Sequence, residues 1–368
     1  MKILYVSTIS NTINAFLIPH IQILIDQGHH VDIACNVQRK IDVSLINQGC
    51  KVFDIKFQRS PLKKDNYLAY MKLKKIINDE GYNIVHTHTP VASVCTRLAC
   101  RNMKNVKVFY TAHGFHFYEG APFTNWVVYY PIEKCLSIYT DVLITINQED
   151  YQRSKRSFKA GRVEYIPGVG LDTEKFTSVT IEKSVKRREL GLPEDAFVLL
   201  SVGELNKNKN HEIVIKAIAR LNNSRICYVI CGTGPLENYL RDLASTLGVG
   251  NQVKLLGFRN DIAEICKATD IFVFPSLREG LPVSLMEAMA AGLPVLCSDI
   301  RGNRDLITNR KGGYLVSPND VGGFAKNINS LIMCTNERLN MAKYNIEAVN
   351  SFKSINVSKR LQEIYSSI

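Results

Sequence analysis

Short runs of apolar and β-branched residues alternate along the chain with longer segments whose apolar positions recur at helical spacing. In the first half, the runs that predict strands are residues 2–7, 30–35, 51–55, 83–87, 107–112, 141–146 and 163–166. The segments that predict helices are 13–27, 66–80, 91–102, 126–139 and 148–158. This alternation predicts right-handed crossovers and a parallel sheet with helices on both faces.

The same pattern restarts in the second half. Strands are predicted at 197–202, 226–231, 252–256, 270–274, 294–297 and 314–316, and helices at 210–221, 235–247, 284–291 and 320–333. Pro167, Gly168 and Gly170 interrupt the pattern between the halves, and a charged stretch follows them. We therefore predict an α/β protein of two doubly wound, Rossmann-like domains that face each other across a cleft.

The domain boundaries follow from these breaks. We expect a first domain over 1–166, a linker over 167–195 and a second domain over 196–350. A C-terminal helix over 351–368 is expected to pack back on the first domain. Ligands of open α/β sheets bind beyond the carboxyl ends of the strands, so the residues that follow each strand are the candidates for function.

Basic residues exceed acidic ones, and the excess is concentrated in one stretch. The 368 residues include 46 Lys and Arg against 34 Asp and Glu, a formal net charge of +12. Residues 51–107 alone hold 12 basic and 4 acidic side chains. A charge of this size is compatible with nucleic acid, an anionic membrane surface or a phosphorylated substrate as the partner. The positions of the motifs are needed to distinguish these three classes of partner.

The sequence predicts a cytoplasmic protein without a spanning helix. No uncharged apolar run reaches the length of about 18 residues that a membrane-spanning helix needs. Residues 1–7 resemble a first strand rather than a signal peptide. The ten cysteines have no zinc or redox spacing, so we expect them to be buried thiols in a reducing compartment.

Two strand-to-helix turns of the second domain combine glycines with polar side chains. Strand 197–202 is followed by Gly203 and then by Lys207 and Lys209. Strand 226–231 is followed by Gly232 and Gly234. Turns of this composition suit a diphosphate, because glycine lets backbone amides approach it and lysine neutralises it. A solvated turn is the alternative interpretation.

A third turn carries two glutamates. Strand 270–274 runs into a loop with Glu279 and Gly280, and Pro282 then suits a helix start. Glu287 lies about one turn into that helix, among apolar residues. A carboxylate there is costly to bury unless donors such as sugar or ribose hydroxyls hydrogen-bond it. A capping acid followed by a surface acid is the alternative.

Together these motifs resemble those of a known enzyme family. The two glutamates with seven residues between them, the loop 203–209 and the turn at 232–234 resemble the retaining, family-4-type glycosyltransferases of the GT-B fold, or glycosyl transferases group 1. Residues 167–176 resemble the interdomain signature of that family. Residues 203–211 and 110–117 are similar to segments of bacterial enzymes of capsular and exopolysaccharide assembly.

The resemblance implies a role for each matching residue. Lys209 would neutralise the donor diphosphate, Glu279 would hydrogen-bond the donor sugar and Glu287 would bind the ribose. The other donor-binding positions that it implies are Gly203, Glu204, Lys207, Gly232, Gly234, Phe258, Gly280, Leu281 and Pro282, with Phe258 beside the nucleobase.

Two departures from the family pattern affect these roles. Many relatives carry an arginine where this chain has Glu204, so the second cation is expected from Lys207 or from elsewhere. The loop 7–14 lacks the glycine pair of many relatives, and its acceptor contacts cannot be transferred.

The first domain contributes a histidine to the predicted site. Strand 107–112 ends at His113, which the resemblance places toward the reacting sugar. A neutral imidazole there would hydrogen-bond a donor hydroxyl or stabilise developing charge. We interpret His86, His88 and His116 as hydrogen-bonded strand-end histidines, because their spacing fits no common zinc site. No Asp-x-Asp pair occurs, so neither a metal nor another cofactor is expected. The predicted catalytic set is His113, Glu279 and Lys209.

A basic amphipathic segment and an aromatic stretch predict contact with a membrane or the acceptor. The basic residues lie in or just before helix 66–80: Lys63, Lys64, Lys72, Lys74 and Lys75. Cationic amphipathic helices bind anionic lipid surfaces. Residues 115–130 hold seven aromatic residues, including Trp126, the only tryptophan. A solvated helix and ordinary core packing are the respective alternatives.

These observations favour a retaining glycosyltransferase of capsule or exopolysaccharide biosynthesis. It would move a sugar from a nucleotide donor, with UDP as the expected nucleotide, to a lipid-linked saccharide acceptor. The first domain would bind the acceptor at the inner face of the cell membrane, and the second would bind the donor. A nucleotide-sugar epimerase of the same fold is the alternative within this fold. A nucleic-acid-binding protein would explain the charge but not the strand-end glycines and acids, so no nucleic-acid partner is expected.

Overall fold

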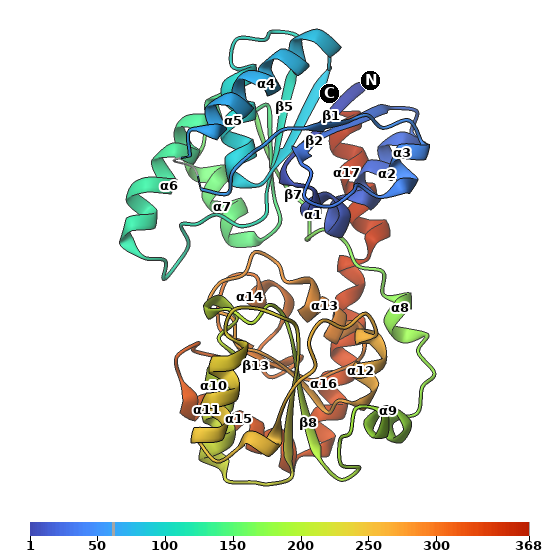
Figure 1. Cartoon of the computed structure of the whole chain (residues 1–368), viewed down its shortest axis with the longest axis vertical. Helices are drawn as coiled ribbons and strands as arrows, with labels where there is room; N and C mark the ends of the chain where they lie inside the picture. Colours follow the sequence, from blue (N-terminus) through green and yellow to red (C-terminus); the bar gives the residue numbers. More distant parts are fainter. Residues whose placement is uncertain (61–62, 368) are drawn as a thin grey trace. The chain divides into compact units, whose positions relative to one another are not determined.

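The computed structural model describes residues 1–60 and 63–367, and the chain divides into two compact units (Figure 1). Unit 1 comprises Met1–Gly170 and Ser354–Ile368, and unit 2 comprises Leu171–Lys353. Residue 368, the last of the predicted C-terminal helix, lies outside the described residues. Each unit is an α/β sandwich around one parallel sheet, as the alternating pattern predicts.

Unit 1 is built on a seven-stranded sheet in the order β3-β2-β1-β4-β5-β6-β7. Its strands are β1 (Lys2–Ile9), β2 (His30–Asn36), β3 (Val52–Asp54), β4 (Ile84–His88), β5 (Lys107–Ala112), β6 (Val142–Thr145) and β7 (Arg162–Tyr165). All neighbouring strands are parallel. The strand order reverses between β1 and β4, which makes the carboxyl ends of these two strands the topological switch point.

Helices cover both faces of this sheet. They are α1 (Ser10–Thr12), the π-helical η1 (Ile13–Leu17), α2 (Ile18–Asp26), α3 (Val43–Asn47), α4 (Asp65–Glu80), α5 (Pro90–Cys100), α6 (Phe123–Leu136), the 3₁₀ turn η2 (Ser137–Tyr139), α7 (Gln148–Ser157) and α17 (Ser354–Ser366). The predicted helix over 13–27 is therefore interrupted. Pro19, in the first turn of α2, lacks an N–H and cannot continue a regular α-helical ladder.

The last helix completes the core of unit 1. α17 packs beside α2, as the ribbon shows (Figure 1). Its side chains Val357, Leu361, Ile364 and Tyr365 are buried in one cluster with Ile3 of β1. The core of unit 1 is thus assembled from the two ends of the chain.

Unit 2 is built on a six-stranded parallel sheet in the order β10-β9-β8-β11-β12-β13. Its strands are β8 (Phe197–Val202), β9 (Ile226–Cys231), β10 (Val253–Leu255), β11 (Ile271–Phe274), β12 (Val295–Ser298) and β13 (Gly313–Val316). The order reverses between β8 and β11, so the switch point of this sheet lies where these two strands end.

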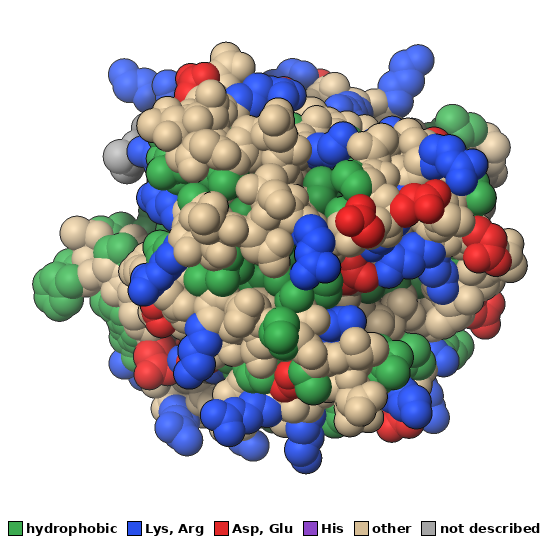
Figure 2. Space-filling model, turned by 90° about the horizontal axis from the view of Figure 1, so that it is seen from below, with side chains coloured by type: hydrophobic (Ala, Val, Ile, Leu, Met, Phe, Trp, Pro, Cys, Tyr) green, Lys and Arg blue, Asp and Glu red, His purple; other side chains and the backbone are tan. Residues whose placement is uncertain are grey.

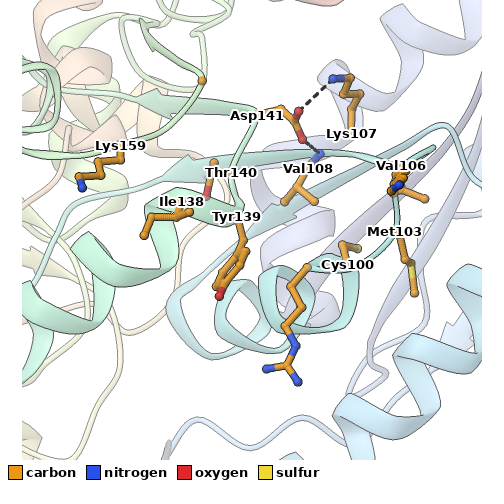
Figure 3. Close-up of a pocket in the computed structure, with 13 residues that line it drawn as sticks. Cys100, Met103, Val106, Lys107, Val108, Ile138, Tyr139, Thr140, Asp141 and Lys159 are labelled. Carbon is orange, nitrogen blue, oxygen red and sulfur yellow. Dashed lines mark hydrogen bonds and ion pairs between the residues drawn. The ribbon is translucent and has the colours of Figure 1, made fainter.

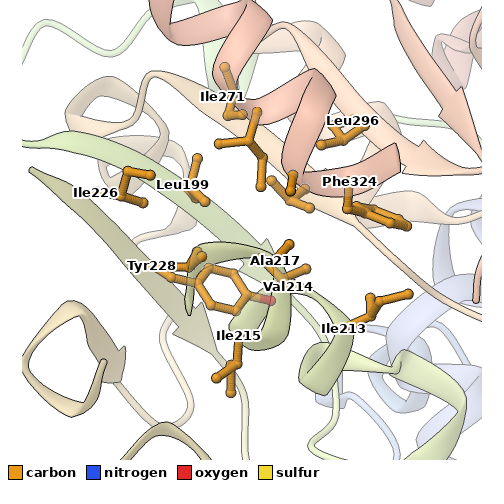
Figure 4. Close-up of a cluster of buried hydrophobic side chains, with 14 of the residues drawn as sticks. Leu199, Ile213, Val214, Ile215, Ala217, Ile226, Tyr228, Ile271, Leu296 and Phe324 are labelled. Atoms are coloured by element: carbon orange, nitrogen blue, oxygen red, sulfur yellow. The ribbon is translucent and has the colours of Figure 1, made fainter. Parts of the chain in front are cut away.

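The helices of unit 2 pack against both faces of its sheet. They are α8 (Glu174–Thr177), α9 (Lys183–Glu189), η3 (Lys207–Lys209), α10 (His211–Leu221), α11 (Glu237–Thr246), η4 (Gly250–Gln252), α12 (Ile262–Ala268), α13 (Val283–Ala290), α14 (Asn303–Leu306), α15 (Val321–Met333), α16 (Thr335–Ala348) and η5 (Val349–Phe352). Leu199, Ile271 and Leu296 of the strands pack with Val214 of α10 and Phe324 of α15, all buried (Figure 4).

The segment predicted as a linker, 167–195, is largely part of unit 2. Its helix α9 buries Lys186, whose Nζ lies 2.7 Å from Asp261 and 2.6 Å from Glu264. Arg187 likewise pairs with Asp270 at 2.7 Å. Buried cations are stable only when they are paired, and a charge-rich sequence alone does not distinguish such a network from a solvated linker.

Two further expectations concern the thiols and the membrane. Eight of the ten cysteines are buried free thiols, whereas Cys135 and Cys334 are exposed. Within residues 1–60 and 63–367, no helix is both long and apolar enough to cross a membrane.

Candidate active site

The switch point of unit 2 brings together two predicted residues from distant parts of the sequence. Lys209 follows β8 and Glu279 follows β11, and the Nζ of Lys209 lies 2.7 Å from Oε1 of Glu279. Both side chains are largely buried, with 19% and 14% of their area exposed. The Lys209 ammonium also lies 4.6 Å from the centroid of the Phe274 ring. The pair retains unused hydrogen-bonding capacity on both the ammonium and the carboxylate.

Three asparagines around the lysines fix the loop that carries Lys209. Asn206 accepts a hydrogen bond from the Lys209 amide at 3.0 Å. Asn208 donates to the Arg278 carbonyl at 2.9 Å. Asn210, in the left-handed region at φ 52°, donates to the carbonyls of Pro275 and Pro318 at 3.2 and 2.9 Å. The loop is therefore tied to the segment that leads to Glu279.

The glycines of the two turns allow the loops to touch. A Cβ on Gly232 would lie 1.9 Å from the Gly203 carbonyl oxygen, and one on Gly234 would lie 2.5 Å from the Leu205 carbonyl oxygen. A Cβ on Gly203 would lie 3.0 Å from Cε of Lys209, so the lysine stem runs over this glycine. Close packing of backbone thus already requires glycine at 232 and 234.

A cavity of about 300 Å³ opens beyond the ends of β8, β9 and β10. Its lining includes Gly203, Glu204, Gly232, Phe258 and Arg259. The Phe258 ring is 75% exposed, an unusual state for a large apolar side chain. Arg259 is held by Asp261 at 2.5 Å and supplies a cation that the sequence analysis did not identify.

Lys207 is placed differently from the other predicted donor residues. It lines a separate cavity of about 310 Å³ with His211, Leu277 and Asn319. Glu204, by contrast, lines the cavity that holds Arg259. Arg259 is therefore a better candidate than Lys207 for the second cation, and its position in the loop that follows β10 was the signal that could have identified it.

The loop after β11 packs closely against the loop after β12. A Cβ on Gly302 would lie 2.3 Å from the Gly280 carbonyl oxygen. The buried Arg301 donates to the Glu279 carbonyl at 3.3 Å, a contact that sequence reasoning missed. Leu281 is buried, and Pro282 directly precedes the first turn of α13. Backbone amides at the start of a helix favour anions.

Glu287 lies on α13 in an environment that disfavours its charge. Burial raises the pKa of its carboxyl to about 7, and the nearby Lys175 offsets this only in part. Among the described residues, no hydrogen bond to the carboxylate of Glu287 is present. A carboxylate in this state gains most from a ligand that supplies hydroxyl donors.

Unit 1 presents histidines at the carboxyl ends of adjacent strands. His88 of β4 lies 3.1 Å from His113 after β5, Nδ1 to Nε2. Burial lowers the pKa of His113 to about 4 and that of His88 well below its usual value, so both rings are neutral. His86 is hydrogen-bonded to Tyr365 and Thr111 at 2.6 and 2.7 Å, which agrees with our interpretation of it.

The predicted membrane residues also lie in unit 1. All five lysines, Lys63, Lys64, Lys72, Lys74 and Lys75, are exposed, and Lys72 also donates to the Asp54 carbonyl at 2.8 Å. Trp126 is half-buried, and its ring lies 5.8 Å from Phe117 and 4.6 Å from the Arg153 guanidinium. Most of the aromatic stretch therefore packs inward.

A metal site is not formed by the described part of the chain. Within residues 1–60 and 63–367, no group of three His, Cys, Asp or Glu side chains is placed to hold an ion. The arrangement offers a cation–carboxylate pair, a helix start and a half-buried carboxylate at the edge of one sheet, a combination suited to a nucleotide diphosphate sugar.

Comparison with known proteins identifies the family. Residues 182–348 match the family description "Glycosyl transferases group 1", and residues 2–147 match "Glycosyl transferase 4-like". EpsD of Bacillus subtilis (strain 168), a protein named as a glycosyltransferase, is 41% identical over 336 residues, 90% of this chain and 87% of EpsD. The UDP-Gal:alpha-D-GlcNAc-diphosphoundecaprenol alpha-1,3-galactosyltransferase of Escherichia coli is 32% identical over 307 residues, 81% of this chain and 78% of that enzyme.

Solved structures agree on the fold. The crystal structure of Anabaena HepE in complex with UDP superposes with a TM-score of 0.82 at 22% identity, over 100% of both chains. The protein is thus an enzyme of the GT-B fold, a glycosyltransferase. It belongs to the group 1 glycosyltransferases, as its motifs predict.

Proposed function

We propose that this glycosyltransferase moves a sugar from a UDP donor to a lipid-linked saccharide, with retention of configuration, during assembly of a capsule or exopolysaccharide. The observation that carries the donor side is the Lys209–Glu279 pair at the switch point, together with the half-buried Glu287, whose carboxylate has no hydrogen bond among the described residues. The names of the relatives support the donor and the acceptor, because the Escherichia coli enzyme is named for UDP-Gal and a diphosphoundecaprenol-linked sugar.

The donor would occupy the carboxyl edge of the unit 2 sheet. Lys209 neutralises the diphosphate with the amides of Gly280, Leu281 and the start of α13. The free oxygen of Glu279 accepts hydrogen bonds from sugar hydroxyls, and Glu287 accepts them from the ribose. Phe258, exposed beside the cavity with Arg259, offers its ring to the base.

The reaction proposed is a front-face displacement. The bond between the anomeric carbon and the diphosphate oxygen breaks, and UDP leaves with the electron pair. The acceptor hydroxyl oxygen bonds to the same face of that carbon, and its proton passes to the departing phosphate oxygen. Lys209 stabilises the growing phosphate charge, and His113 contributes a neutral imidazole rather than an imidazolium. No metal takes part in this scheme.

The location proposed is peripheral, at the inner face of the cell membrane. The exposed residues Tyr67, Leu68 and Met71 of α4, with the surrounding lysines, support this proposal. A basic helix with exposed apolar side chains is attracted to anionic lipid.

Donor binding is tested with a panel of nucleotides and nucleotide sugars by thermal shift and calorimetry. We expect UDP and one UDP-sugar to raise the melting temperature of the protein, without added metal. Stabilisation by a guanosine or adenosine diphosphate sugar in place of UDP would exclude the proposed donor.

Catalysis is tested with Glu279→Ala. The variant should fold, because the side chain is not in the core, and transfer should fall by roughly a hundredfold or more because a sugar contact and the partner of Lys209 are lost. Glu347→Ala, exposed on α16, is the matched control. Near-normal turnover of Glu279→Ala would contradict the role assigned to Glu279.

A further inference from the structure

Helix α6 presents an apolar face that no other described element covers. Phe123, Val127, Val128 and Ile132 are 80%, 56%, 50% and 43% exposed, and Ile138, just beyond the helix, is 58% exposed. At 3.6 residues per turn, positions 123, 127, 128 and 132 all fall within one half of the circumference of α6, the half that is exposed. Figure 2 shows hydrophobic side chains gathered at its left edge, the side on which α6 lies in Figure 1.

The charges of α6 leave this face without a carboxylate. The single acidic residue of the helix, Glu133, is buried and pairs with Arg97 at 2.8 Å. Lys134 is exposed. Because burial removes the only acid of α6 from the surface, the exposed part of the helix is apolar and cationic.

A basic cavity continues the apolar face at its C-terminal end. The cavity, about 330 Å³, lies where β5, β6 and β7 begin, and Ile138 belongs to its lining (Figure 3). The apolar part of the lining includes Met103, Val106 and Tyr139. Four cations surround it: Arg101, Lys104, Lys107 and Lys159.

Three of these cations are available to an anion. Asp141, the acid of the lining, is used by Lys107 at 3.1 Å and by the Val108 amide at 2.8 Å (Figure 3). Arg101, Lys104 and Lys159 are exposed, and within residues 1–60 and 63–367 no carboxylate forms an ion pair with them.

The cavity is separate from the candidate active site. It lies at the amino ends of the strands, whereas His88 and His113 lie at the carboxyl ends of β4 and β5. Catalysis at the carboxyl edge therefore gives no reason for a cluster of cations at the opposite edge.

The apolar face of α6 and the basic cavity together fit one kind of partner. A second copy of this face would bring like charges together, and a free phosphate would leave the apolar face of α6 in water. A bilayer with anionic headgroups satisfies both parts, since acyl chains cover the apolar side chains and headgroup phosphates meet the cations.

We propose that α6 and the basic cavity form the membrane-docking surface of this protein, with Phe123, Val127, Val128, Ile132 and Ile138 inserted at the interface and a phospholipid phosphate held by Arg101, Lys104 and Lys159. The proposal rests on the proposed lipid-linked acceptor. It assigns the main contact to α6 rather than to the lysines of α4.

The charge half of the proposal is tested by sedimentation with vesicles of phosphatidylcholine, with and without phosphatidylglycerol. The test variant replaces Arg101, Lys104 and Lys159 with Gln. The matched control makes the same change at three exposed lysines of unit 2: Lys311, Lys326 and Lys343. We expect the test variant to bind the anionic vesicles roughly a hundredfold more weakly, at about one decade or less per cation, and the control to bind like the unaltered protein.

The apolar half is tested with Val127→Ser, Val128→Ser and Ile132→Ser combined. This variant should lose roughly tenfold or more in vesicle binding, because less apolar area enters the interface. The matched control replaces Val185, Met333 and Leu339, exposed apolar residues of unit 2, with Ser and should bind normally.

The outcomes separate this proposal from its competitors. The charge variant and the apolar variant should both still bind UDP. Failure of the unaltered protein to bind UDP would refute the proposed function and not the docking surface. Unchanged vesicle binding by both variants would overturn the proposal. So would loss of binding only on changing the α4 lysines, or an α6 variant whose sole effect is to dissociate a dimer in sedimentation velocity.

Discussion

Glu287 illustrates how one half-buried carboxyl connects stability with ligand binding. Its pKa is about 7, against 4.5 in the absence of the protein environment. Between these values the folded chain holds a proton that the unfolded chain has lost, so stability falls as the pH rises through this window. At 1.36 kcal/mol per pH unit the loss amounts to roughly 3 kcal/mol above pH 7.

We predict that Glu287→Gln has opposite effects on stability and binding. At pH 8 the variant should be more stable by up to roughly 3 kcal/mol in the urea unfolding of unit 2, because it lacks the buried charge, whereas at pH 5 it should match the original protein. UDP affinity at pH 8 should fall by roughly tenfold or more, since hydrogen bonds to a carboxylate are lost.

Glu347→Gln, on the exposed surface of α16, should change neither quantity. Equal stability of Glu287→Gln and the unaltered protein at pH 8 would contradict the raised pKa of Glu287.

The lowered pKa of His113 leads to a second prediction about a single residue. Burial lowers the pKa of His113 to about 4, so its ring should remain neutral from pH 8 down to about pH 5. The Cε1–H signal of His113, assigned with a His113→Gln variant, should therefore stay constant in NMR spectra over this range. Free histidine in the same buffer is the reference, and a shift of the His113 signal in parallel with it would show that the site is hydrated.

At the scale of elements, the apolar pattern predicted the strands better than the short helices. Every strand ends within two residues of its predicted bounds, because a parallel strand buried on both faces is a continuous apolar run. The helices α3, α9 and α12 escaped prediction. They have five to seven residues, too few to show a helical period above the surrounding charges.

The sequence predicted which residues belong to the candidate site, but not which of their side chains contact one another. Strand ends identified Lys209 and Glu279, but their 2.7 Å contact depends on a strand order that one sequence does not reveal. The sequence also could not predict which cavity each cation lines. Lys207 lines a cavity away from the other predicted donor residues, and Arg259 lines the cavity that includes Gly203.

The contact between the turns after β8 and β9 gives a prediction about their glycines. Gly232→Ala should destabilise unit 2 by roughly 3 kcal/mol or more, measured by urea unfolding, because the new Cβ would lie 1.9 Å from the Gly203 carbonyl oxygen. Gly257→Ala is the matched control. Its φ of +67° is also left-handed, but nothing lies within 4 Å of the new Cβ, so only a backbone cost of about 1 kcal/mol is expected. Equal losses would show that the turns can separate.

At the scale of the whole molecule, unit 2 is one continuous segment and unit 1 is not. Leu171–Lys353 forms unit 2, whereas unit 1 needs Ser354 onward to complete its core. The side chain of Tyr365 reaches His86 at 2.6 Å, so the end of the chain also supports the histidines at the carboxyl edge.

Removal of α17 should therefore unfold one unit and spare the other. A chain that stops after Lys353 loses four buried side chains worth about 1.5–3 kcal/mol each, which together approach the whole stability of a domain. Calorimetry should then show a single transition, that of unit 2, and the shortened chain should still bind UDP.

Two point variants check that the core contacts of α17 cause this loss. Leu361→Ala should destabilise unit 1 by about 2–5 kcal/mol, and Ile355→Ser, at a position 71% exposed, should not. Two transitions in the shortened chain would contradict the role of α17.

The return of α17 also sets an order of events on the ribosome. Chains are made from the N-terminus, and domains generally fold as they emerge. Here unit 1 begins first but is completed only after unit 2, because Val357, Leu361, Ile364 and Tyr365 are translated after Leu171–Lys353. Unit 2 is complete in sequence once residue 353 is free of the ribosome, while the nascent sheet of unit 1 still exposes the apolar face that α17 will cover. During synthesis, this apolar face of unit 1 is therefore open to non-specific association until α17 emerges.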